Sequence, residues 1–333
     1  MTIHSRISGF GRFVPEKELG NDEIASHSDI TDDWIVSRTG ISSRRILTGG
    51  MTGTDMAQYA AEASLKTAGI TAGDLTHILY ATCTPDACCP SAACILAAKL
   101  GIKGRMAVDI NAACAGFING LMLADALLLK DVAARVLLVA SESLSHRCNW
   151  EDRGTAVLFG DGAGAVLVTS ETKAPPSGMS AAVIDTLAAS DGNRGALLLI
   201  SGGFSASPYK LGDRVGPDYF IRMNGGLVFK HAVRSMSACC LELLSRNSLT
   251  PDDVDLFVPH QANLRIIEAV GARLGVPDNK VFLNVHKYGN TSAASIPLAL
   301  SEAVDQGRIV PGMRVLMATF GGGLTWGAGL VQF

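Results

Sequence analysis

Cys114 stands in a sequence context that suits a reactive thiol. Met106–Ile110 before it has the pattern of a short buried strand, and Gly116–Leu129 after it has the pattern of a helix. A cysteine at a helix N-terminus lies near free N–H groups and the positive end of the helix dipole, and both favour the thiolate. Because the thiolate is the nucleophilic form, this placement favours covalent catalysis. A small buried cysteine without a chemical role is the alternative that the local sequence leaves open.

Two further polar residues could complete such a site. His260 follows the apolar run Leu256–Pro259, and Asn290 comes just before an apolar stretch that starts near Thr291. Taken singly, His260 is typical of a core or capping residue and Asn290 of a helix cap or turn. Together with a cysteine, a histidine can polarise or protonate a substrate and an asparagine can donate hydrogen bonds to an oxyanion.

The chain repeats itself once. Gly69–Leu75 resembles Ser248–Val254, and Arg135–Ala140 resembles Arg314–Thr319, both at an offset of 179 residues. An internal repeat of this size indicates a duplicated structural unit.

Each half of the repeat alternates helices with short apolar strands. This pattern predicts an α/β fold with two similar halves, 1–172 and 178–333, packed in layers around buried central helices. The best junction is the segment 173–178, which contains two prolines and a glycine. We expect Cys114 to begin the buried helix of the first half and Asn290 that of the second, so that the pseudo-twofold axis brings them together with His260.

Composition bounds the class of protein. The chain has 333 residues, 48% hydrophobic and 18% charged, which is enough for a large core. A net charge of −3 without a Lys/Arg run argues against nucleic acid as a main partner. Residues 1–6 show no signal-peptide stretch, and Leu121–Leu129 is too short to span a bilayer. We therefore expect a cytoplasmic protein without membrane insertion.

One cluster of cysteines and two clusters of glycines are better explained by structural roles than by metal or nucleotide binding. The cysteines at 83, 88, 89 and 94 lack paired metal-ligand spacing and a nearby histidine, so core or pocket-lining thiols are favoured over a metal site. Gly160–Gly164 and Gly321–Gly323 are each followed by a strand-like run, which excludes a dinucleotide loop and predicts tight turns with close backbone approach. Gly323 could point a free N–H into a cleft.

Trp34 and Arg38 lie one helical turn apart. An exposed tryptophan with an arginine beside it can stack on a planar base, although ordinary surface stacking gives the same pattern.

These segments together, in order and over essentially the whole chain, resemble the β-ketoacyl-acyl-carrier-protein synthase III family of thiolase-fold condensing enzymes. The segments that carry the resemblance are Trp34–Gly40, Ala112–Phe117, Arg153–Thr155, Gly160–Ala165, Pro259–Asn263, Tyr288–Pro297 and Phe320–Gly327. The resemblance implies a thiolase-like duplicated fold with layers in the order α-β-α-β-α.

The resemblance also implies roles at matching positions. Cys114 would accept the acyl group, His260 and Asn290 would stabilise the enolate formed from malonyl-ACP, and the N–H groups of Cys114 and Gly323 would form the oxyanion hole. The positions matching the CoA and pantetheine contacts of the family are Trp34, Arg38, Arg153, Phe229 and Asn263. The positions matching basic residues that dock the acidic carrier protein are Lys230 and Arg265.

The implied reaction is the decarboxylative condensation of an acyl-CoA primer with malonyl-ACP, which initiates fatty-acid synthesis through an acyl-cysteine. It requires no cofactor or metal, acyl-CoA and the carrier protein are its partners, and a homodimer is expected. A secondary-metabolite acyltransferase or condensing enzyme of the same fold, and a non-catalytic partner subunit, are the alternatives. At Cys89, many family members carry an aromatic residue that caps the primer pocket of the partner subunit, so this chain leaves room there for longer or branched primers.

Overall fold

The structure, a computed structural model, describes residues 5–26, 30–170 and 175–333. The first four residues, which belong to the segment without a signal-peptide pattern, lie outside the described ranges. The strands are β1 (Arg6–Phe13), β2 (Glu18–Gly20), β3 (Ser43–Arg45), β4 (His77–Ala81), β5 (Met106–Ile110), β6 (Arg135–Ser143), β7 (Asp161–Thr169), β8 (Ala181–Ser190), β9 (Leu198–Leu199), β10 (Arg222–Met223), β11 (Leu256–Pro259), β12 (Arg314–Gly321) and β13 (Thr325–Gln332). The helices are α1 (Asn21–Ala25), α2 (Asp32–Thr39), α3 (Gly53–Ala68), α4 (Ala92–Lys99), α5 (Gly116–Lys130), α6 (Gly225–Arg246), α7 (Leu264–Leu274), α8 (Val285–Tyr288) and α9 (Ser295–Asp305).

The main sheet has nine strands in the order β11-β12-β13-β8-β1-β7-β6-β4-β5. In the first half of the chain, β5, β4 and β6 run parallel, while β7 is antiparallel to both of its neighbours. The second half repeats this arrangement, since β11 and β12 are parallel and β13 is antiparallel to β12 and β8. A parallel bridge from Phe257 to Val281 takes the place that β5 has in the first half.

The same strand order on both sides of the β1–β8 pair supports a duplicated fold. The two halves meet where Arg6 pairs with Ala182 and Ile7 with Ala181. We keep the division into 1–172 and 178–333 as a proposal. Residues 171–174, which include Lys173 and Ala174 of the expected junction, lie outside the described residues.

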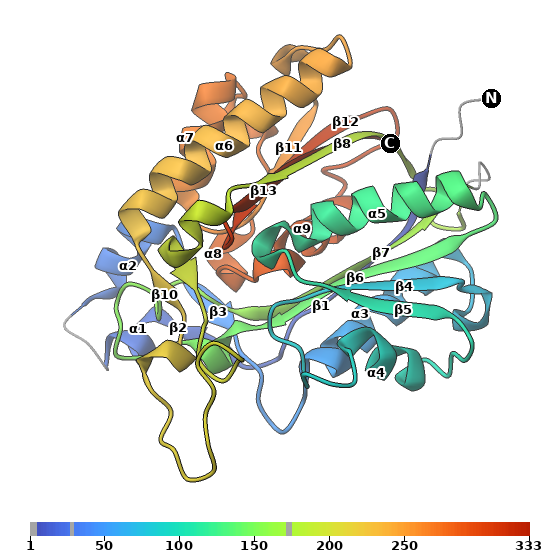
Figure 1. The fold of residues 1–333 in the computed structure, drawn as a ribbon. Coiled ribbons are helices and arrows are strands. Elements are labelled where there is room, and N and C mark those ends of the chain that lie inside the picture. The colour runs from blue at the N-terminus through green and yellow to red at the C-terminus, as the bar shows by residue number, and fades with distance from the viewer. Residues whose placement is uncertain (1–4, 27–29, 171–174) are drawn as a thin grey trace.

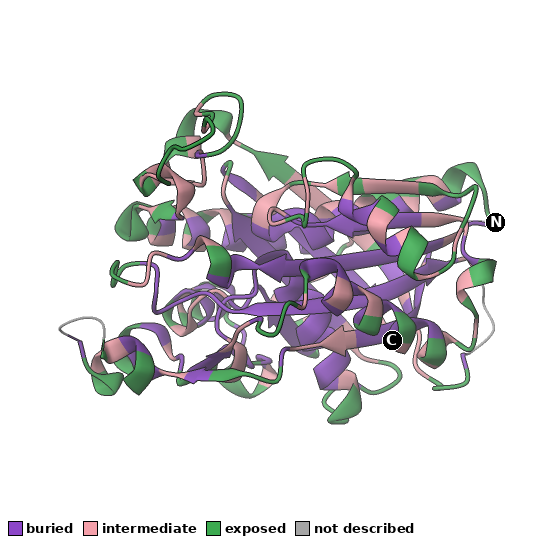
Figure 2. Ribbon diagram, turned by 90° about the horizontal axis from the view of Figure 1, so that it is seen from below, coloured by how far each residue is buried: buried purple, intermediate pink, exposed green. Residues whose placement is uncertain are grey.

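The nine strands form two half-sheets, one made of β1, β7, β6, β4 and β5 and the other of β8, β13, β12 and β11. Helices fill the space between the two half-sheets and cover their outer faces, as Figure 1 shows. α5 contacts β4 and β6 of one half and β8 and β13 of the other, and α9 contacts β1, β7 and β11. α3 and α4 cover the first half-sheet, and α6 with α7 covers the second. The expected α-β-α-β-α layering is confirmed, and Figure 2 shows the buried strands enclosed by helices whose outer faces are exposed.

The sequence pattern of α5 is confirmed on its inner face. Phe117, Leu121, Ala124 and Leu128 are all buried. The prediction of a fully buried helix is wrong, because Leu123 and Leu129 are exposed on the other side.

The 3-10 turn Ala113–Ala115 and α5 together form an apolar segment longer than the run Leu121–Leu129 considered in the sequence. The segment Ala113–Lys130 is long and apolar enough, by length and composition, to be a candidate membrane span. Core helices of soluble proteins meet the same criterion, and α5 packs against both half-sheets as such a helix does.

Glycines let the central helices approach the sheet closely. A Cβ on Gly164 would lie 2.6 Å from the backbone nitrogen of Leu298 in α9, and one on Gly321 would lie 2.7 Å from the backbone nitrogen of Cys114. Close backbone approach was the prediction for both glycine clusters. The prediction of a turn holds for Gly322–Gly323 between β12 and β13, but Gly162 and Gly164 lie inside β7.

The strand before Cys114 has the predicted bounds but not the predicted burial. β5 is an edge strand that pairs only with β4 among the described residues, and Met106 and Asp109 on it are exposed. A strand at the edge of a sheet offers unpaired backbone groups to another chain.

Candidate active site

Cys114 lies in a strained turn between β5 and α5. It is the middle residue of a 3-10 turn, Ala113–Ala115, that leads directly into the helix. Ala113 before it has a φ of 44°, in the left-handed region that non-glycine residues rarely adopt. The carbonyl of Cys114 accepts a hydrogen bond of 2.7 Å from the Thr319 hydroxyl of β12, which fixes the turn against the second half of the fold. The backbone that carries the thiol is therefore fixed by the second half of the fold.

Burial governs the ionisation of this thiol. Removal from water raises the pKa of Cys114 to about 12, and a hydrogen bond from Ser292 opposes that shift without cancelling it. The expectation that the helix N-terminus would favour the thiolate is therefore wrong for the resting site. The dipole and free N–H groups contribute less than the loss of hydration in a residue that is 7% exposed.

His260 follows β11 directly, as expected, and is buried. Its Nδ1 lies 2.6 Å from the hydroxyl of Ser295, the first residue of α9. The same hydroxyl accepts a hydrogen bond from the backbone N–H of Gln261. Burial lowers the pKa of His260 to about 3, so the imidazole is neutral at physiological pH. No hydrogen bond reaches its Nε2 from the described residues.

Asn290 does not begin a helix. It forms a parallel bridge with Phe159, and a 3-10 turn at Ser292–Ala294 separates it from α9. Its Oδ1 accepts a 2.8 Å hydrogen bond from the backbone N–H of Ser292. An oxygen at that position leaves the amide Nδ2 as a donor without a partner among the described residues. The turn therefore presents two N–H bonds of Asn290 for use elsewhere.

The structure brings Cys114, His260 and Asn290 to one cavity, which we call the entrance cavity. Its volume is about 390 Å³. The predicted residues that line it are Trp34, Arg38, Cys114, Arg153, Phe229, His260, Asn263, Arg265 and Asn290. Cys114, His260 and Asn290 come from three separate turns after β5, after β11 and before α9, and sequence distance hides their proximity.

Basic and aromatic side chains gather at the mouth of the entrance cavity. The Arg38 guanidinium lies 4.4 Å from the centre of the Trp34 ring, and that of Arg265 lies 5.8 Å from the Phe229 ring. Asn263 caps α7 and donates a hydrogen bond to the carbonyl of Arg38, which ties α7 to α2. Arg153 is exposed and makes no ion pair within the described residues. This mouth can receive a planar base and phosphate groups.

Lys230 is the one predicted binding residue of this group that lies outside the cavity lining. It is exposed on α6, one position beyond Phe229. It makes no ion pair within the parts of the chain that the structure describes.

A second cavity, which we call the inner cavity, opens on the other side of Cys114. Its volume is about 480 Å³, and its lining is mainly apolar. The residues that line it include Cys83, Cys114, Leu144, Phe159, Leu198, Ile200, Phe204, Ala206, Ile221, Ser292 and Gly323. Cys114 borders both cavities, whereas His260 and Asn290 border only the entrance cavity. The N–H of Gly323 has no acceptor among the described residues.

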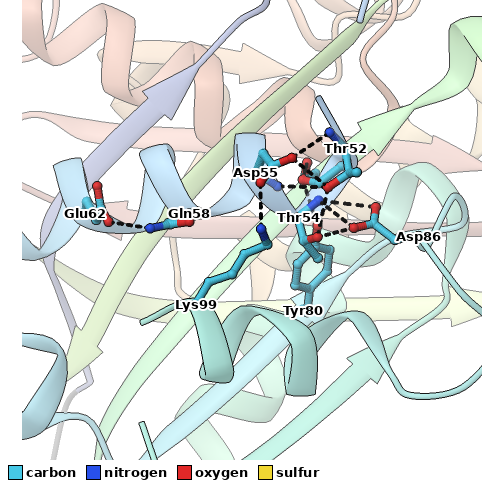
Figure 3. Close-up of polar contacts among 10 residues, drawn as sticks. Thr52, Thr54, Asp55, Gln58, Glu62, Tyr80, Asp86 and Lys99 are labelled. Atoms are coloured by element: carbon cyan, nitrogen blue, oxygen red, sulfur yellow. Dashed lines mark hydrogen bonds and ion pairs between the residues drawn. The ribbon is translucent and has the colours of Figure 1, made fainter. Parts of the chain in front are cut away.

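Cys89 does not line either cavity of its own chain. It is exposed at the end of the loop that joins β4 to α4. Figure 3 shows how this loop is fixed, since Asp86 accepts hydrogen bonds from the backbone N–H and hydroxyl of Thr54 at the start of α3. The loop is therefore held in place while Cys88 and Cys89 face outward.

Glu142, a buried acid beside the Cys114 thiol, was not predicted from the sequence. Glu142 is the next-to-last residue of β6 and is fully buried, and burial raises the pKa of its carboxyl group. Its oxygens accept hydrogen bonds from the hydroxyls of Thr84 (2.6 Å) and Ser292 (3.0 Å) and from the backbone N–H of Cys83 (3.1 Å). Ser292 therefore lies between the two groups: its hydroxyl donates to Glu142, and its presence beside Cys114 lowers the pKa of the thiol.

Only a weak signal in the sequence could have found this acid. Glu142 is the one charged residue in Val136–Ser143, an otherwise apolar and small-residue strand. A charge within a buried strand is expected to have several hydrogen-bond partners, but the sequence does not say which residues supply them.

Models of known families match two parts of the chain. Residues 108–192 match the family described as 3-oxoacyl-[acyl-carrier-protein (ACP)] synthase III, and residues 244–333 match the C-terminal model of that family.

Curated relatives and solved structures agree with the family models. A β-ketoacyl-[acyl-carrier-protein] synthase III from Nitratidesulfovibrio vulgaris is 57% identical over 333 residues, covering 100% of both chains. The crystal structure of the 3-oxoacyl-[acyl-carrier-protein] synthase III from Aquifex aeolicus has a TM-score of 0.89 at 42% identity and covers 99% of this chain and 100% of that one. The priming β-ketosynthase of the R1128 polyketide pathway has a TM-score of 0.87 at 33% identity, with 98% and 96% coverage.

Proposed function

The chain belongs to the 3-oxoacyl-[acyl-carrier-protein] synthase III family, and from that premise we propose that Cys114, His260 and Asn290 carry its reaction. It is an acyltransferase that condenses an acyl primer in the initiation of fatty-acid synthesis. The observation that carries the assignment is the position of Cys114, which borders both cavities while His260 and Asn290 border one.

In the first half-reaction, the sulfur of Cys114 attacks the thioester carbonyl of an acyl-CoA in the entrance cavity. The C–S bond to CoA breaks, and the thiol proton of Cys114 ends on the departing CoA as its free thiol. The tetrahedral oxyanion receives hydrogen bonds from the backbone N–H groups of Cys114 and Gly323. Each such donor contributes about 2.7–4 kcal/mol in other oxyanion holes. The free N–H of Gly323 at the edge of the inner cavity supports this role.

In the second half-reaction, malonyl-ACP enters the same cavity. Loss of CO2 leaves its electron pair on a thioester enolate, whose oxygen accepts hydrogen bonds from Asn290 and His260. The enolate carbon then attacks the acyl-Cys114 thioester, so that a C–C bond forms and the C–S bond to Cys114 breaks. The products are β-ketoacyl-ACP and the Cys114 thiolate, which takes up a proton from water. Within the described residues, Nδ2 of Asn290 and Nε2 of His260 have no hydrogen-bond partner, which supports this division of labour.

The acyl group of the primer occupies the inner cavity in this proposal. The entrance cavity must be free for malonyl-ACP, and the inner cavity is the apolar space on the far side of the nucleophile. Cys89 reaches that space only from a neighbouring subunit, because it does not line the cavity of its own chain. A small side chain there leaves the outer end of the cavity open to longer or branched primers.

The mouth of the entrance cavity binds both molecules that carry a thioester, CoA and the acyl carrier protein. Trp34 and Arg38 stack on the adenine of CoA, and Arg153 pairs with its phosphates. Phe229 and Asn263 line the passage of the pantetheine arm. Arg265 and the exposed Lys230 attract acidic side chains of the carrier protein.

The proposal extends to the assembly of the protein and to its location in the cell. We propose a homodimer in which the free edge of β5 pairs with its counterpart, supported by the exposed Met106 and by exposed apolar side chains of α5 such as Leu129. The protein acts in the cytoplasm without membrane insertion. The two half-reactions need only thiol chemistry and hydrogen-bond donors, so no resident cofactor is assigned.

A second candidate function keeps the site and changes the pathway. The likeness to the R1128 priming β-ketosynthase favours a condensation that starts a secondary metabolite. The two candidates differ in the primer, so acetyl-CoA separates them.

The test measures each half-reaction on the full-length protein. Incubation with acetyl-CoA should add one acetyl group to Cys114 by intact-protein mass spectrometry, and malonyl-ACP should then release acetoacetyl-ACP. The variant C114A should lose both signals with an unchanged circular-dichroism spectrum, while C94A, which removes an exposed thiol, should keep them. An acyl adduct on C114A would refute the nucleophile. Acylation by other primers with no ketoacyl product from acetyl-CoA would favour the second candidate.

A further inference from the structure

The hydroxyl of Ser295 determines which nitrogen of His260 carries the proton. A neutral imidazole has one N–H and one bare nitrogen, and the proposed reaction needs the N–H at Nε2, where the substrate lies. The partner of Nδ1 decides between the two tautomers, and that partner is Ser295 Oγ at 2.6 Å.

The backbone N–H of Gln261 orients the Ser295 hydroxyl. It can only donate, so Ser295 Oγ is the acceptor in their contact of 3.4 Å. The hydroxyl proton then needs an acceptor of its own, and His260 Nδ1 is the only one within hydrogen-bond distance among residues 5–26, 30–170 and 175–333. A buried hydroxyl without an acceptor is destabilising, because it loses its hydrogen bonds to water and gains none in the protein. The network is complete only when Ser295 donates and Nδ1 accepts.

The N-terminus of α9 favours the same arrangement. Ser295 is the first residue of this eleven-residue helix, so Nδ1 of His260 lies against the positive end of the helix dipole. A positive potential disfavours a proton on the nitrogen that faces it and favours a bare, electron-rich one. Two independent features, the hydrogen-bond network and the dipole, therefore leave Nδ1 without a proton.

We propose that Ser295 is a positioning residue that holds His260 in the Nε2–H tautomer, so that His260 acts beside Asn290 as a second hydrogen-bond donor to the enolate oxygen. This inference rests on the proposed function, and it adds a residue that acts only through His260. It also assigns His260 no part as the base that takes the Cys114 proton, because Nε2 already bears one.

The variant S295A tests the proposal by removing the donor to Nδ1, and S295T serves as the matched control that keeps a hydroxyl. Decarboxylation of malonyl-ACP should fall about 10²-fold in S295A, the cost of one lost oxyanion donor. Acylation of Cys114 by acetyl-CoA should change little, and S295T should recover most of the decarboxylation. Failure of wild-type acylation would count against the proposed function itself, whereas equal loss of both half-reactions in S295A would overturn only the role of Ser295.

The tautomer can also be read directly. In protein labelled with ¹⁵N-histidine, the His260 signals are identified by their absence from H260Q. Wild type should show a protonated Nε2 and a bare Nδ1, and S295A should shift the population toward Nδ1–H. A protonated Nδ1 in the wild type would overturn the proposal even if S295A did not fold.

Discussion

Ala113 and Ser292 adopt the same left-handed backbone conformation, with φ values of 44° and 50°, at positions 179 residues apart. That separation is the offset of the internal repeat, and each residue starts a 3-10 turn that runs into a central helix. For an L-residue, this conformation costs about 1–2 kcal/mol. The register makes Ala293 the counterpart of Cys114 and Asn111 that of Asn290, so the duplicated turn holds a nucleophile in one half and a donor in the other.

The buried thiol should resist alkylation at neutral pH. Because burial raises the pKa of Cys114 to about 12, its thiolate fraction, and with it the rate of reaction with iodoacetamide, should rise about tenfold per pH unit between pH 7 and 10. Peptide mass spectrometry gives the rate at Cys114, and the exposed Cys94 shows that the reagent is active. A rate at Cys114 that levels off below pH 8 would contradict this expectation.

The variant N290D should separate the two half-reactions. Aspartate keeps an oxygen to accept the N–H of Ser292 but has no N–H to offer the enolate. Decarboxylation of malonyl-ACP should fall about 10²–10³-fold while acylation of Cys114 by acetyl-CoA stays close to wild type. The comparison uses CO2 release and protein mass on the same samples, and a parallel loss of both would argue against a donor role for Asn290.

Acid should destabilise the fold through His260. Its pKa is lowered to about 3 by burial, against a value near 6.5 in the unfolded chain, so the unfolded state binds more protons below pH 6.5. The contribution of neutral His260 is therefore complete above pH 6.5 and is lost as the pH falls toward 3. At pH 5 the loss is about 1–2 kcal/mol. Urea unfolding of wild type and H260Q from pH 7 to 4.5 should give a shallower pH slope for the variant, and identical slopes would refute this account.

An aromatic residue at position 89 should narrow the choice of primer. The loop is fixed through Asp86 and Thr54, so C89F would place its ring at a defined site on the surface. In the proposed dimer, that ring closes the partner's inner cavity, and acylation by branched or medium-chain acyl-CoAs should fall at least tenfold while acetyl-CoA is little affected. The neighbouring exposed residue provides the control, C88F. Unchanged primer preference in C89F would remove Cys89 from the pocket.

Periodicity and repetition predicted the parts of the fold that depend on local sequence. The buried face of α5 follows from the spacing of Phe117, Leu121 and Leu128, and the bounds of β5 from its apolar run. The exposure of β5 was missed because an edge strand and a central strand have similar composition.

The ionisation of the site depends on contacts that sequence does not encode locally. The pKa of Cys114 follows from its burial under both halves of the fold, which outweighs the helix N-terminus that the sequence reveals. Glu142 and Ser292 meet across 150 positions of the chain. Such partners become visible only once the two halves are packed together.

The position of Cys114 between two cavities has a kinetic consequence. In the proposed reaction, acyl-CoA and malonyl-ACP use the entrance cavity in turn, and the acyl group on Cys114 occupies the inner cavity. This arrangement enforces a ping-pong order, because CoA has to leave the entrance cavity before malonyl-ACP can bind there. Accumulated free CoA would then compete with malonyl-ACP for the entrance cavity. The rate of condensation would therefore depend on the ratio of free CoA to malonyl-ACP in the cell.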